Sequence, residues 1–121
     1  MTPLGRKLRH LRQVRGQTLK EMALGLNVSA AYLSSLEHGK RGQPTWFLVQ
    51  RIINYFNLIW DDAEEIQRLA ELSHPRPVID TIGLSPEATE LANILAQKIG
   101  DIDAETCRKM SEWLQQTKVP S

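Results

Sequence analysis

The stretch NVSAAYLSSLEHGKRG, residues 27–42, gathers side chains whose chemistry is recognition of a polar surface. It offers hydroxyl groups, small methyl groups, one phenol and two adjacent cations: Ser29, Ala30, Ala31, Tyr32, Ser34, Ser35, Lys40 and Arg41. Hydroxyls donate and accept hydrogen bonds, methyl groups pack on apolar atoms, and lysine and arginine bind anions. The stretch therefore raises the question of whether these groups contact a partner, and of which kind.

Charge is unevenly distributed along the chain. Residues 1–60 hold nine Lys and Arg against two acidic residues, a net charge of +7, whereas residues 61–121 hold six against twelve, a net charge of −6. A basic half attracts a phosphate backbone, and an acidic half is repelled from it. The alternative is a chance excess on two solvated surfaces. The coincidence of the basic residues with the stretch above favours the functional interpretation.

Catalytic and metal-binding patterns are not found in the sequence. The three histidines show no metal-ligand spacing, and there is no Cys-x-x-Cys, glycine-rich phosphate loop or Ser/His/Asp arrangement in a recognisable context. We therefore expect no enzyme activity, no cofactor and no metal. The residues beyond the first 60 are too few for a large enclosed pocket, so no small-molecule ligand is expected.

The sequence also predicts a cytoplasmic protein. No apolar run approaches the roughly 20 residues that span a bilayer, and the basic start MTPLGRKLRHLRQ lacks the apolar region of a signal peptide. The single Cys107 fits a reducing compartment. We expect it to be a small core residue, with a redox role as the minor alternative.

Apolar periodicity predicts helices throughout, hence an all-α fold. Five are expected in residues 1–73, with inward-facing positions at Leu4, Leu8, Leu11, Met22, Ala23, Leu26, Leu33, Leu36, Val49, Ile52, Ile53, Phe56, Ile66, Leu69 and Ala70. Thr18 and Glu21 form a capping box for the second helix, Ser29 caps the third, and Asp61 is expected to cap the fifth. Gly16 and Gly39 end the first and third helices.

Residues 74–84 are predicted to form a linker, since two prolines in HPRP stop a helix. Within it, residues 78–82 are predicted to form a short strand. Residues 85–117 then read as two amphipathic helices joined by a short turn, beginning at Ser85 and Asp103. The closing segment TKVPS is expected to fray.

The run TLKEMALGLNVSAAYLSSLEHGKRGQPT carries a resemblance. Residues 4 to about 58 resemble the phage-repressor/Cro-like, or xenobiotic-response-element, helix-turn-helix family of bacterial transcriptional regulators. Ala23 is the small residue where the two helices cross, and Asn27 stands where the family usually has glycine. The resemblance implies a five-helix repressor-like domain whose third helix enters the major groove of DNA.

That resemblance implies roles for individual residues. The outward face of the third helix is expected to consist of Ala30, Ala31, Ser34 and Ser35, with Tyr32 at its margin. None of these is a strong base reader, so direct readout is expected to be modest and DNA shape to supply the rest. The alternative for the two alanines is helix propensity on a surface that reads nothing.

Phosphate contacts are expected from Thr18, Ser29, Lys40 and Arg41. The family often has a polar residue at the position of Leu19, and the leucine side chain cannot bind phosphate. Only the backbone amide of Leu19 could do so. The resemblance also implies an ion pair between Arg12 and Glu37, which we interpret as structural.

The two C-terminal helices present one apolar face that must be covered. We expect a homodimer whose interface contains Leu91, Leu95, Met110, Trp113 and Leu114. Such a dimer would bind double-stranded DNA as a transcriptional regulator at an inverted repeat with half-sites about 34 Å apart. The alternatives are an antitoxin-like protein whose hairpin binds a protein partner, and an interaction domain that no longer binds DNA.

Overall fold

The computed structural model of the protein describes residues 1–117; residues 118–121 lie outside the described part, and with them most of the TKVPS segment predicted to fray. The described chain is helical and contains no strand. It divides into two compact units, Met1–Pro77 and Val78–Ser121, and the division falls within the predicted linker. The helices are α1 (Pro3–Val14), α2 (Leu19–Leu26), α3 (Ala30–Glu37), α4 (Trp46–Tyr55), α5 (Trp60–Glu71), α6 (Pro86–Lys98) and α7 (Ala104–Gln116), with a 3₁₀ turn at Ile99–Asp101.

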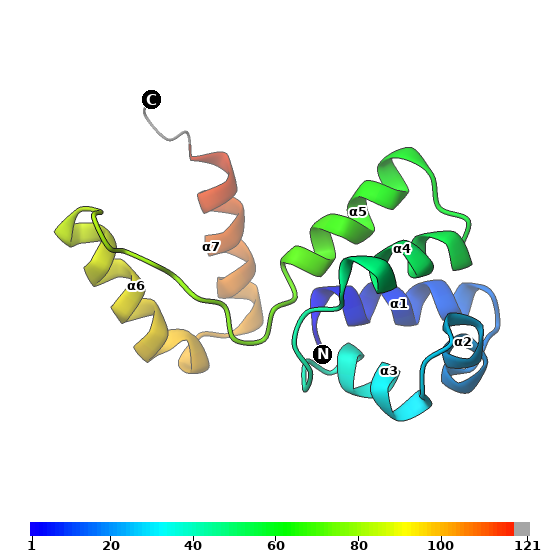
Figure 1. Ribbon diagram of the computed structural model, residues 1–121. Coiled ribbons are helices and arrows are strands. Elements are labelled where there is room, and N and C mark those ends of the chain that lie inside the picture. Colours follow the sequence, from blue (N-terminus) through cyan, green and yellow to red (C-terminus); the bar gives the residue numbers. More distant parts are fainter. Residues whose placement is uncertain (118–121) are drawn as a thin grey trace. The chain divides into compact units, whose positions relative to one another are not determined.

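The first unit is a bundle of five short helices around one apolar core (Figure 1). Helix α1 packs against α3 and α5, and α4 packs against α2 and α5. Fourteen apolar residues are buried, including thirteen of the fifteen inward positions predicted from periodicity. The other two, Leu11 and Leu69, are half-buried and pack against the same core. The predicted all-α fold with a helix-turn-helix unit is therefore confirmed.

Local sequence signals fix most helix ends. The Thr18 hydroxyl accepts from Glu21 N at 3.1 Å while Glu21 Oε1 accepts from Thr18 N at 3.1 Å, which completes the capping box. Asn27 ends α2 in the left-handed region with φ 60°. Gly16 and Gly39 follow α1 and α3, also at positive φ. The chain therefore turns where glycine and asparagine permit it.

Two local predictions were wrong. Asp61 does not cap α5: the helix begins one residue earlier at Trp60, the capping position is Ile59, and no side chain caps it. Asp61 lies in the first turn instead, where the helix dipole favours a carboxylate. Residues 78–82 form no strand, because Asp80 Oδ1 accepts from Ile82 N at 2.9 Å and Thr81 O accepts from Leu84 N at 3.0 Å. The segment is irregular and leads into a turn at residues 81–84.

The second unit is a hairpin of α6 and α7. Ser85 caps α6, with Pro86 at its first position, and Asp103 caps α7, as predicted. No residue among 78–117 is buried within the unit. Across residues 1–117, no helix combines the length and apolar character that a membrane span requires.

Candidate nucleic-acid interface

Helices α2 and α3 form the helix-turn-helix pair, joined by a short turn (Figure 1). Val28 N donates to Ala23 O at 3.0 Å across the turn, which fixes the direction in which α3 leaves α2. Ala23 is 2% exposed at this crossing, so no larger side chain would fit there without displacing a helix. The Ser29 hydroxyl accepts from Tyr32 N at 3.0 Å and caps α3. The amino end of α3 is thus set rigidly on α2.

The predicted contact residues of α3 differ in exposure. Ala31 is exposed, and Tyr32, Ser34 and Ser35 are half-buried. Ala30 is also half-buried but packs against the core. It shares the inner face of the helix with Leu33 and Glu37, three and seven residues further on. Of the two alanines, only Ala31 has a methyl group that is open to a partner. The prediction that Ala30 lies on the outward face is wrong, because its side chain packs against the core.

Arg41 and Lys40 follow α3 in an exposed loop. The Arg41 guanidinium lies over the Tyr32 ring, 5.8 Å from its centroid, and Lys40 N donates to Ser35 O at 2.9 Å. A cation over a tyrosine face is attracted by the ring quadrupole. The loop is therefore tied to α3, and Tyr32 holds the Arg41 cation beside the helix. Sequence reasoning treated Tyr32 and Arg41 separately, since it carries no signal for this stacking.

The amino end of α2 differs from an ideal phosphate site. The Glu21 carboxylate already accepts from the Thr18 amide, so a negative charge occupies this helix end. An incoming phosphate would be repelled by it. Thr18 retains its hydroxyl proton as a donor, and exposed Lys20 lies two residues on. Lys20 is a cation that sequence reasoning did not single out for this end of α2.

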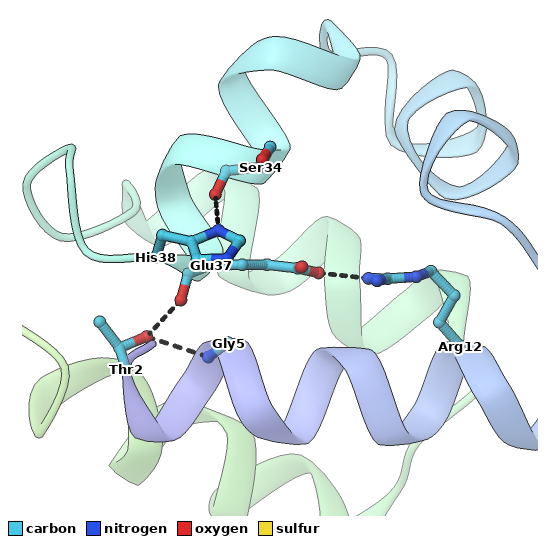
Figure 2. Close-up of polar contacts among 6 residues, drawn as sticks. All are labelled: Thr2, Gly5, Arg12, Ser34, Glu37 and His38. Carbon is cyan, nitrogen blue, oxygen red and sulfur yellow. Dashed lines mark hydrogen bonds and ion pairs between the residues drawn. The ribbon is translucent and has the colours of Figure 1, made fainter.

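Arg12 and Glu37 form a buried ion pair between α1 and the end of α3 (Figure 2). The Arg12 Nη1 group donates to Glu37 Oε2, and the two side chains are 10% and 1% exposed. A buried charge without its partner would be costly, so each residue depends on the other. The pair connects α3 to α1 at one point.

A second contact connects the same two helices at the amino end of α1 (Figure 2). Thr2 N donates to Glu37 O at 3.0 Å, and the Thr2 hydroxyl accepts from Gly5 N at 3.0 Å. A Cβ atom on Gly5 would lie 2.2 Å from Glu37 O, a backbone atom that cannot swing away. Gly5 is therefore required by the close approach of α1 and α3. The sequence contains no signal that separates Gly5 from any other helical glycine.

The end of α3 carries one further polar contact. His38 Nδ1 lies 2.9 Å from Ser34 O, so the ring folds back along the last turn of the helix (Figure 2). Together with the two contacts of Glu37, this leaves the carboxyl end of α3 held from several sides.

In the hairpin, the five residues predicted for a dimer interface line one groove. Leu91 and Leu95 of α6 face Met110, Trp113 and Leu114 of α7 across a cavity of about 420 Å³. Ile99 and half-buried Cys107 complete its apolar wall. Trp113 and Leu91 are 66% and 59% exposed, which is unusual for side chains of this size on one face.

Comparison with known proteins agrees with this geometry. Residues 3–69 match the family model described as a helix-turn-helix domain, so the chain belongs to the helix-turn-helix family. The chain is also similar to an uncharacterized HTH-type transcriptional regulator, RghRB, of Bacillus subtilis (strain 168), with 43% identity over 44 residues. That match covers 36% of this chain and 32% of the relative, so the chain spans about a third of the relative's length. No solved structure matches significantly.

Proposed function

We propose that this protein is a sequence-specific DNA-binding regulator of transcription. The observation that carries the proposal is the helix-turn-helix unit, matched over residues 3–69, in which capped and anchored α3 presents Ala31, Ser34 and Ser35. An α-helix held in this way fits the major groove of B-DNA. The net charge of +7 in residues 1–60 supplies the attraction to phosphate.

This surface would form few specific hydrogen bonds with bases and would depend more on the shape of the DNA. The Ala31 methyl group can pack on a thymine methyl group, and serine hydroxyls accept or donate to several base edges. Arg41, held over Tyr32, and Lys40 are the cations nearest in sequence to this helix, and they are suited to phosphates or a groove edge. Thr18 and Ser29 would add contacts at the starts of α2 and α3.

We further propose that the protein acts as a homodimer through the hairpin. Residues 78–117 contain no buried residue, and a two-helix unit of this size is too small to be stable without further burial. A second copy would cover the groove by forming a four-helix bundle. A two-fold dimer would then bind an inverted repeat with half-sites about one helical turn apart.

A hetero-partner is the alternative occupant of the groove, as in an antitoxin-like protein. The apolar groove between α6 and α7 is the observation that supports it. Sedimentation of the full chain separates the two cases. The wild-type protein should sediment as a dimer and Leu95→Asp as a monomer, whereas Gln97→Asp, with the same added charge on an exposed position outside the groove, should remain a dimer. A wild-type monomer at all concentrations would favour the hetero-partner.

DNA binding is tested by selecting bound genomic fragments and footprinting the best one. The expected result is a protected inverted repeat. In salt titrations on that fragment, Arg41→Ala should lower the slope of log K against log salt by about 1, because one phosphate contact is lost. Arg76→Ala, which removes an exposed linker cation, is the matched control and should leave the slope unchanged. Absence of binding at low salt would refute the proposal.

A further inference from the structure

The turn before α5 exposes two large apolar side chains that the DNA-binding surface does not use. Ile59 and Trp60 are 65% and 82% exposed. Trp60 also has φ +52°, a conformation that bulky L-residues avoid because the side chain crowds the backbone. Within residues 1–117 its ring takes part in no aromatic pair or cation–π contact. Backbone outliers of this kind are concentrated at functional sites.

Acidic residues follow directly. Asp61, Asp62 and Glu64 are exposed, and none of them forms an ion pair in the described part of the chain. The helix dipole accounts for carboxylates at this end of α5, but it does not account for the exposed isoleucine and tryptophan. We call Ile59, Trp60, Asp61 and Asp62 the knob. A partner for the knob must combine an apolar pocket with positive charge.

A pocket of that kind lies on the first unit. It is lined by Pro3, Arg6, Lys7 and His10 of α1 and by Leu69 of α5, with a volume of about 410 Å³. Pro3 and Leu69 give it apolar walls, and the other three residues give it basic ones. Lys7 pairs with Glu65 at 2.9 Å, whereas Arg6 and His10 are exposed and make no ion pair with any described residue. The pocket and the knob are complementary in charge and in polarity.

The knob cannot enter the pocket of its own chain. Trp60 and Leu69 lie nine residues apart on the same helix, a separation of about 13 Å at 1.5 Å per residue. A rigid helix holds them apart. Only the pocket of another copy is within reach.

We infer that the knob of one copy docks in the α1/α5 pocket of a second copy, head to tail. The Trp60 indole would lie against Pro3 and Leu69 with the Arg6 guanidinium over its face, an arrangement that gains from cation–π attraction. Asp61 and Asp62 would face Lys7 and His10. Because the two surfaces differ, a head-to-tail contact leaves a free pocket on one copy and a free knob on the other, so further copies can add.

The small area of this contact limits its affinity, and therefore the conditions under which it forms. A tryptophan buries about 150–250 Å², and the whole contact is far smaller than the roughly 1,200 Å² of a stable interface. It is therefore weak between free molecules and gains strength where copies are already held side by side, as at neighbouring sites on one DNA. The contact itself does not require DNA binding, so it can be tested without DNA.

The experiment uses two complementary full-length variants. Arg6→Glu keeps the knob and blocks the pocket, and Trp60→Ala keeps the pocket and removes the knob; both positions are exposed, so the fold is preserved. Unlabelled Trp60→Ala protein is titrated to about 1 mM, the weak end of the affinity scale, into ¹⁵N-labelled Arg6→Glu protein. The indole N–H resonance of Trp60 is expected to shift in proportion to occupancy, while that of Trp46 stays fixed.

The control titration adds unlabelled Arg6→Glu protein, which has the same hairpin but no working pocket. Its affinity should be at least tenfold weaker, so the Trp60 resonance should shift far less at the same concentration. Equal shifts in both titrations, or no shift in either, would overturn the inference. As a second readout, the wild-type protein and Trp46→Ala should show a mass above that of the dimer at high concentration, whereas Trp60→Ala should not.

Discussion

Removing the Glu37 carboxylate tests how the carboxyl end of α3 is anchored to α1. Glu37 is 1% exposed, and its partner Arg12 is 10% exposed at the side chain. Breaking a buried pair by deleting one partner costs about 3–5 kcal/mol, because a buried charge is left uncompensated. Since Arg12 keeps some contact with water, we expect the lower end for Glu37→Ala, about 3 kcal/mol of unfolding free energy.

For a domain of this size that loss lowers the melting temperature by roughly 12–24 °C, at about 4–8 °C per kcal/mol. The measurement is a thermal melt of the full chain followed by circular dichroism. Glu37→Gln separates charge from packing, because it keeps the volume of the side chain and one acceptor oxygen. The melting temperature of Glu37→Gln should lie between those of Glu37→Ala and the wild type. Glu65→Ala removes the partly exposed pair with Lys7 and should lower the midpoint far less than Glu37→Ala does.

The double variant Arg12→Met, Glu37→Met completes the test. Apolar side chains of similar length leave no buried charge, so stability should return close to that of the wild type. The reasoning is refuted if Glu37→Ala loses less than about 1 kcal/mol, the value expected of a surface pair. It is equally refuted if the double variant is as unstable as the single one, since the loss would then come from packing.

Three further outcomes are expected. Gly5→Ala should destabilise the fold by about 3 kcal/mol, because its Cβ would meet Glu37 O at 2.2 Å, whereas Gly42→Ala, with nothing within 4 Å, should be neutral in denaturant melts. Hydrogen bonds from the Thr106 hydroxyl and backbone amide hold the pKa of Asp103 below its usual range. The cap on α7 should therefore be fully formed above the unfolded pKa and weaken as pH falls through the lower folded pKa; NMR shifts of the Thr106 amide would follow this, and Asp103→Asn should abolish it. Ala31→Glu should eliminate DNA binding at all salt concentrations without changing the melting temperature, because the new charge would face the bases; retained affinity would remove α3 from the groove.

The parts of this fold that could be predicted are those encoded by neighbouring residues. Thr18 and Glu21 cap each other within one turn, and Asn27 takes a conformation that its own side chain tolerates. Burial followed from the spacing of leucines and isoleucines, since one face of each helix must turn inward. These signals are local, so they can be recognised in the sequence without knowledge of the tertiary structure.

What could not be predicted depends on distant contacts. Gly5 matters only because α1 approaches the backbone of Glu37. Ala30, by contrast, lies three residues before buried Leu33, and this spacing could have placed it on the inner face. The start of α5 at Trp60 was missed because aspartate is a strong capping signal and a tryptophan at positive φ is a weak one. The contact surfaces with DNA and with a second copy remain proposals that the experiments above address.

The exposed methyl group of Ala31 has a consequence for the chemical state of the DNA. In the major groove, thymine is marked by its C5 methyl group, and cytosine methylated at C5 displays the same group at the same place. The two bases differ only at the neighbouring position, an acceptor on thymine and an amino donor on cytosine, and the Ser34 and Ser35 hydroxyls accommodate either. If α3 lies in the groove as proposed, the protein would treat 5-methylcytosine much like thymine. Its set of binding sites would then depend on base modification as well as on sequence.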